Sequence, residues 1–301
     1  MISKSEFLNR VHGSIFPLLK KMEQERVAVL KKWVVGMIVL DIVLTAAAGI
    51  GIGLMSEWNF VLIITIVLPL GIAAYKSNVF SHQLKEKFIP LLYSLINLKN
   101  KTQGHETRWI DFEALLNKGL FGSNSHLWGY DDHFCAQDNS FFVEEIKAIE
   151  GSGRNRTVVF DGFVFEMPTN VKLKQKILIL QKLNLLSPKR FKPKKSLGYQ
   201  EMTMNDAVFD ERFQVYTKDE NETKCVLNKM LLRHILSLHD IYPKAIINLL
   251  IENNKITITF NTNKNMFEFF SIYHSLLKDK FFEQFYDEIA ALYKVRDTLK
   301  S

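Results

Sequence analysis

The sequence contains few of the residues that cross-link or interrupt a chain, with 2 cysteines, 7 prolines and 14 glycines among 301 residues. So few cysteines exclude a disulfide scaffold, and the composition excludes a collagen-like chain. Cys135 and Cys225 have no CxxC spacing, and we expect both to be free thiols in a reducing compartment. Hydrophobic residues make up 47% of the chain, which also excludes a disordered protein.

The sequence also lacks the short motifs that mark common enzyme classes. GxxxxGK[ST], GxGxxG, GxSxG and HExxH are all missing, so the corresponding nucleotide-binding, hydrolase and zinc protease classes have no support. We therefore predict no catalytic residues, no cofactor and no metal site, and a chain that is not an enzyme.

The best candidate for chemistry is the cluster Asp131, Asp132, His133 and Cys135. Carboxylate, imidazole and thiol groups can all bind zinc. However, neighbouring residues on a strand point to opposite faces of the sheet, so these side chains cannot all converge. An alternative hypothesis keeps a membrane-tethered enzyme, with its site near Asp131, Asp132 or His133.

Charge is almost missing from two long apolar runs, residues 34–55 and 58–75. A bilayer core about 30 Å thick needs roughly 20 apolar residues in a helix, so both runs qualify as transmembrane segments. Only Ser56 and Glu57 separate them, which predicts a helical transmembrane hairpin over residues 33–75. A signal peptide is a poor alternative because the first run begins late and a second follows at once. A buried soluble hairpin is a poor alternative because such runs exceed most core helices.

The flanks of this hairpin are basic, whereas its loop contains no Lys or Arg. The positive-inside rule therefore predicts a multi-pass protein of the cytoplasmic (inner) membrane, with both termini in the cytoplasm and the lipid bilayer as a partner. The flanking basic residues are Lys4, Arg10, Lys20, Lys21, Arg26, Lys31 and Lys32 before the hairpin and Lys76, Lys85 and Lys87 after it.

Asp41 is the one charged residue inside the first run. It lies about 10 Å from the start of the run at 1.5 Å per residue, where a carboxylate costs about 3 kcal/mol. We favour a neutral, hydrogen-bonded Asp41. The alternative is a proton or cation site in a small oligomeric channel or transporter subunit. Small residues at Thr45, Gly49 and Gly53 allow close helix packing, either within the hairpin or in a homo-oligomer.

The remaining sequence predicts an α+β fold. We expect an amphipathic helix in residues 1–32, a juxtamembrane helix in 76–99, and a cytoplasmic domain in 100–301 with a mainly antiparallel sheet and C-terminal helices. Within this domain, strands are expected at 140–149, 156–167, 176–182 and 210–219. Helices are expected at 110–119, 222–239 and 279–299. Residues 245–252 and 255–260 should form a hairpin, because Asn253-Asn254 suits its turn.

Two segments, 209–238 and 255–270, resemble the pattern of a bacterial membrane-protein family catalogued as domain of unknown function 3137. The pattern is a Phe-rich strand ending in Tyr and Asp, a short helix with a break, and a hairpin closed by Phe-Glu. The matching residues are Phe209, Phe213, Val215, Tyr216, Asp219, Leu227, Met230, Phe267 and Glu268. The family's Thr-Pro break is replaced here by Asn228-Lys229. The resemblance implies a membrane protein and a partner among LemA-family membrane proteins, but no particular activity.

The densest run of charge consists of Lys189, Arg190, Lys192, Lys194 and Lys195. Such a run is usually a solvated loop. The functional alternative is contact with an anionic lipid surface, which the net charge of +7 also favours. We expect no nucleic acid, because few aromatic residues interleave the run. The sequence thus predicts a two-span inner-membrane protein with a cytoplasmic binding or scaffolding domain.

Overall fold

The structure is a computed structural model that describes residues 2–51, 68–100, 110–116, 118–121, 125–136, 138, 140–183, 193, 197–262 and 275–300. The chain divides into two compact units. The first, the helical unit, contains residues 2–95 and 267–283. The second, the sheet unit, contains residues 96–266 and 284–301.

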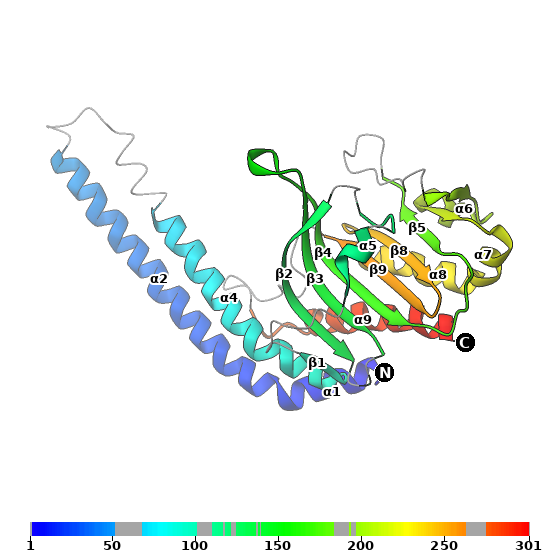
Figure 1. The fold of residues 1–301 in the computed structure, drawn as a ribbon. Coiled ribbons are helices and arrows are strands. Elements are labelled where there is room, and N and C mark those ends of the chain that lie inside the picture. The colour runs from blue at the N-terminus through cyan, green and yellow to red at the C-terminus, as the bar shows by residue number, and fades with distance from the viewer. Residues whose placement is uncertain are drawn as a thin grey trace. The chain divides into compact units, whose positions relative to one another are not determined.

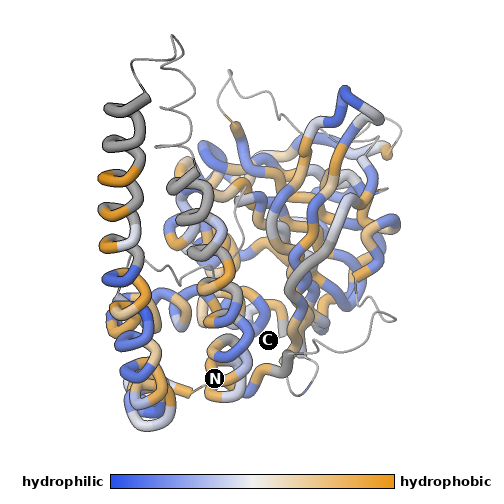
Figure 2. The backbone as a smooth tube through the Cα atoms, turned by 90° about the vertical axis from the view of Figure 1, so that its left-hand side faces the viewer, coloured by the Kyte–Doolittle hydropathy of each residue, from blue (hydrophilic) through white to orange (hydrophobic). Residues whose placement is uncertain are grey.

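Three helices build most of the helical unit: α1 (Lys4–Ser14), α2 (Phe16–Gly51) and α4 (Leu68–Leu95). Helix α1 begins where the Ser3 hydroxyl accepts a hydrogen bond from the Glu6 amide at 3.2 Å. Helices α2 and α4 run in opposite directions (Figures 1 and 2). The three helices pack together through apolar side chains. The side chains buried there include Phe7 and Val11 of α1, Ile15 between α1 and α2, Leu19 of α2, and Leu84, Phe88 and Leu92 of α4.

Only part of the predicted transmembrane hairpin falls on described residues. Residues 34–51 belong to α2 and residues 68–75 to α4, whereas residues 52–67 lie outside the described part of the chain. Among the residues that the structure describes, no helix is both long and apolar enough to cross a membrane.

The sheet unit is built on a nine-stranded sheet formed by the described residues, in the order β1-β2-β3-β4-β9-β8-β5-β7-β6. Every neighbouring pair is antiparallel, so the predicted α+β class with a mainly antiparallel sheet is confirmed. The strands are β1 (Leu98–Asn100), β2 (Ser125–Ala136), β3 (Phe142–Glu150), β4 (Thr157–Pro168), β5 (Ile177–Gln181), β6 (Gln200–Met202), β7 (Phe213–Thr217), β8 (Ile246–Glu252) and β9 (Lys255–Asn261).

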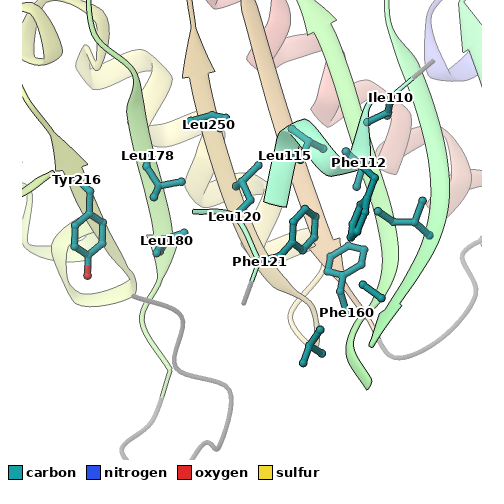
Figure 3. Packing of buried hydrophobic residues seen from close by; sticks show 14 residues of the cluster. Ile110, Phe112, Leu115, Leu120, Phe121, Phe160, Leu178, Leu180, Tyr216 and Leu250 are labelled. Atoms are coloured by element: carbon teal, nitrogen blue, oxygen red, sulfur yellow. The ribbon is translucent and has the colours of Figure 1, made fainter. Parts of the chain in front are cut away.

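Both faces of this sheet are covered. Helix α5 (Phe112–Leu116) lies in front of the sheet in Figure 1, and α8 (Lys229–Ile241) and α9 (Asp279–Lys300) lie behind it. Side chains alternate between the two faces along a strand. Leu178 and Leu180 of β5 therefore pack on the face covered by α5, while Ile177 and Ile179 are buried on the opposite face. We call the buried residues on the first face the α5 cluster; they include Ile110, Phe112, Leu115, Leu120, Phe121, Phe160, Leu178, Leu180, Tyr216 and Leu250. Figure 3 shows the α5 cluster, in which Phe121 meets Phe160 edge to face at 4.9 Å.

Capping side chains explain where the structure departs from the predicted elements. The predicted helix 222–239 is two helices, α7 (Glu220–Val226) and α8, because the Asn228 side chain accepts a hydrogen bond from the Leu231 amide at 2.9 Å and starts a new helix. The predicted strand 210–219 begins late, since Asp206 caps the short helix α6 (Ala207–Arg212) before β7.

Candidate functional site

The residues that the sequence singled out are only partly placed by the structure. Asp41 belongs to α2, but its side chain lies outside the described part. The basic run Lys189, Arg190, Lys192, Lys194 and Lys195 also lies outside the described residues. The roles of Asp41 in the membrane and of the basic run at an anionic surface therefore stay predictions.

The cluster Asp131, Asp132, His133 and Cys135 lies on strand β2. Asp131 and Asp132 fall within a register shift of the β2–β3 ladder between Tyr130 and His133, and their side chains are not among those described. His133 is half-buried and pairs in register with Glu144 of β3. Among the side chains that the structure does describe, no group of three His, Cys, Asp or Glu residues is arranged to hold a metal ion.

The feature that needs explanation in the helical unit is an apolar stripe on α2. We call Val35, Val39, Ile42 and Val43 the α2 stripe. They are spaced by four, three and one residues, so they lie on one side of the helix. Each of the four side chains is more than half exposed, with fractions between 54% for Val39 and 63% for Ile42.

The α2 stripe follows directly after a polar part of the same helix. Lys31 and Lys32 are exposed one turn before Val35. On helix α4, Tyr75 is 69% exposed and Val79 is 39% exposed. In Figure 2, the described residues in the later half of α2 are mainly hydrophobic. Among its described side chains, helix α2 thus passes from charged to apolar surface between Lys32 and Val35.

The polar half of α2 contacts a distant segment of the helical unit through Glu23, which also forms a nearly buried ion pair within the helix. Arg26 donates to Glu23 at 2.7 Å, and the Leu276 amide donates to the same carboxylate at 3.0 Å. The hydrogen bond from Arg26, together with that amide, lowers the pKa of Glu23 to about 2. Anchoring at Glu23 fixes the helix that carries the α2 stripe.

Among the described acids of the sheet unit, Glu288 is one whose chemistry is strongly altered by burial. Glu288 of α9 is 3% exposed, and burial raises its pKa to about 7. Gln284, one turn earlier, donates a hydrogen bond to Glu288 Oε1 at 2.8 Å. The Tyr242 hydroxyl lies beside this carboxyl group, and its interaction with the charged carboxylate partly offsets the effect of burial on the pKa of Glu288. This carboxyl group can therefore take up or release a proton near neutral pH.

The sequence analysis did not identify Glu288, although a signal was present. Phe285, Ile289 and Leu292 are buried at helical spacing, and Glu288 occupies the same side of the helix. An acid within an apolar helical pattern predicts a buried carboxyl group. Tyr242, in contrast, gave no such signal, because it follows the end of α8.

Comparisons with known proteins place part of the chain. Residues 158–301 match the model of the family described as Protein of unknown function (DUF3137). The sequence search of curated proteins gave no match. Among solved structures, the mycobacterial trehalose monomycolate transport factor A, TtfA, is similar over 69% of this chain and 89% of that chain, with 9% sequence identity and a TM-score of 0.37.

Proposed function

We propose that this chain, which belongs to the DUF3137 family through residues 158–301, is a two-span membrane protein with a cytoplasmic binding or scaffolding domain. In this proposal residues 34–55 and 58–75 cross the membrane, and the sheet unit binds a protein partner. The α2 stripe carries the proposal.

An exposed stripe of four branched aliphatic residues is unfavourable in water. Fully burying a Val or Ile side chain contributes about 1.5–3 kcal/mol, and much of this is forfeited where more than half of each side chain stays exposed. In hydrocarbon the same surface is favourable. Tyr75 supports the same boundary on α4, because amphipathic aromatic rings favour the headgroup layer.

The charges near this boundary support cytoplasmic termini. Lys31 and Lys32 are exposed immediately before the apolar half of α2, as expected on the cytoplasmic side of an inner membrane. The basic run between Lys189 and Lys195 would then add attraction to the same anionic leaflet, worth about 1 kcal/mol per residue near the surface. For the protein partner, the resemblance favours LemA-family membrane proteins.

Charged replacements in the α2 stripe test the anchor. Each Lys at the centre of a span costs about 3 kcal/mol of insertion free energy, so Val39→Lys with Ile42→Lys should release the chain from membranes washed with alkaline carbonate. The matched control is Val208→Lys with Met230→Lys, because these two residues are similarly exposed on the sheet unit. We expect the wild type and the control to stay in the pellet. Extraction of the wild-type chain itself would refute the anchor.

A further inference from the structure

Three strands of the sheet unit extend beyond the rest of the sheet. The pairing of β4 with β9 ends at Gly162 and Asn261, but β4 continues back to Thr157 alongside β3. Strand β2 accompanies β3 as far as the pair Ser125 and Glu150. We call residues 125–129 and 147–161 the arm. Figure 1 shows the turn between β3 and β4 projecting away from the sheet.

The tip of the arm has a defined conformation. Gly151 has a φ of +86°, and a Cβ atom there would lie 2.4 Å from the carbonyl oxygen of Asn155. Gly153 has a φ of +60° and begins a short 3-10 helix that ends at Asn155. At Gly151 both the positive φ and the close carbonyl oxygen require glycine, so the turn has a defined shape there. Arg154 and Arg156 are presented by this turn, in which residues 151–156 are all exposed.

The side chains at the tip combine an exposed aromatic ring with positive charge. Trp128 of β2 is 53% exposed, and the guanidinium carbon of Arg156 lies 4.4 Å from its ring centroid. No acidic residue occurs between positions 151 and 156, and Glu150 directly precedes the turn. Lower on the arm, Lys147 and Asp161 neutralise each other at 2.7 Å. Because Arg154 and Arg156 outnumber Glu150, the excess positive charge of the arm lies at its tip.

We infer that the tip of the arm contacts the headgroups of anionic phospholipids. This inference rests on the proposed membrane anchor, which keeps the sheet unit close to a bilayer. Arginine binds phosphate oxygens through a planar fork of N–H donors, and tryptophan favours the headgroup layer. Each basic residue near an anionic surface strengthens the attraction about fivefold, so two arginines suffice for a protein that is already tethered.

A protein partner fits this tip less well. A stable protein interface buries about 800 Å² on each side, whereas the tip offers one aromatic ring flanked by arginines. Nucleic acid also fits less well, because stacking platforms for single strands use several aromatic residues along a basic groove. A lipid headgroup needs only the local combination of ring and charge that is present.

The experiment uses the full chain in lipid nanodiscs and follows tryptophan fluorescence. The chain contains four tryptophans, and Trp33→Phe, Trp58→Phe and Trp109→Phe leave Trp128 as the reporter. Quenching is measured with lipid that carries a nitroxide near the headgroup. In discs with 30% phosphatidylglycerol we expect Trp128 to be quenched at least twofold more than in pure phosphatidylcholine, with the difference lost at high salt. Arg154→Gln with Arg156→Gln should also abolish it.

Controls separate this inference from the anchor itself. Lys229→Gln with Arg233→Gln removes two exposed positive charges elsewhere on the sheet unit and should leave the quenching unchanged. A second reporter chain keeps only Trp33, at the predicted membrane boundary. If Trp33 is not quenched by the labelled lipid, the anchor fails and this inference fails with it. If Trp33 is quenched but the quenching of Trp128 is the same with and without phosphatidylglycerol, only the inference about the arm is overturned.

A second measurement needs no substitution. In the wild-type chain, amide hydrogen exchange over residues 150–157 should slow at least twofold when phosphatidylglycerol is present. Equal exchange in both kinds of disc would likewise overturn the inference.

Discussion

At the scale of single residues, Glu288 shows how position determines chemistry. It shares α9 with exposed acids, yet it lies among apolar neighbours and is 3% exposed. Burial favours its neutral form and raises its pKa to about 7. A carboxyl group that is easier to protonate when folded than when unfolded stabilises the fold at low pH, and this contribution is lost as the pH rises through the folded pKa.

Glu288→Gln should therefore change how stability depends on pH. A shift from 4.5 to about 7 corresponds to about 3 kcal/mol, so the wild type should lose roughly this much unfolding free energy between pH 4.5 and pH 8 relative to the variant. Denaturant unfolding at several pH values measures it. Glu211→Gln, at an exposed acid of α6, is the control and should follow the wild type. If the unfolding free energies of the wild type and Glu288→Gln changed with pH in the same way, burial would not be the cause of a raised pKa at Glu288.

Asp41 poses the corresponding question within the predicted first span. If it is a neutral hydrogen-bonding residue, Asp41→Asn removes an insertion cost of about 3 kcal/mol and keeps the size of the side chain. We expect the amount of protein in membranes to stay equal or rise, with complementation of a deletion strain unchanged. Immunoblotting and complementation measure both. Loss of complementation at normal protein level would instead indicate a proton or ion site.

At the scale of elements, helix α8 depends on its cap. Asn228 provides the side-chain oxygen that accepts from the Leu231 amide, at the position where the family pattern has Thr-Pro. Asn228→Ala should lower the free energy of unfolding by about 1 kcal/mol, whereas Asn228→Asp should retain the cap and most of the stability. Thermal unfolding followed by circular dichroism measures the difference. Equal losses in the two variants would show that the cap contributes nothing.

Elements with strong local signals could be predicted from the sequence. The hairpin of β8 and β9 was predicted at Asn253-Asn254, and Asn254 indeed has a φ of 58°. The C-terminal helix was predicted at 279–299 and is observed as α9, Asp279–Lys300. The turn residues predicted the hairpin and the helical periodicity predicted the C-terminal helix, and the tertiary structure retains both elements. The helix α6 was missed because its six residues carry too few turns for a periodic pattern.

At the scale of the whole molecule, contacts between distant segments could not be predicted. The sheet order places β4 beside β9 and β5 between β8 and β7, and strand composition alone does not select neighbours. The Glu23 carboxylate meets the Leu276 amide across 253 positions, a contact between two segments that the sequence analysis had placed in separate domains. The exposed tip of the arm was also missed, because Trp128 and Arg156 are brought together only by pairing of three strands.

In the proposed topology, residues 34–55 and 58–75 cross a membrane and leave both termini in the cytoplasm. Reporter fusions after Glu57, Asn100 and Ser301 test it most directly. A phosphatase that is active only in the periplasm should work after Glu57 and fail at the two later positions. A fluorescent protein that matures only in the cytoplasm should show the reverse pattern. Fluorescence without phosphatase activity after Glu57, or phosphatase activity after Asn100 or Ser301, would contradict the proposed anchor and its orientation.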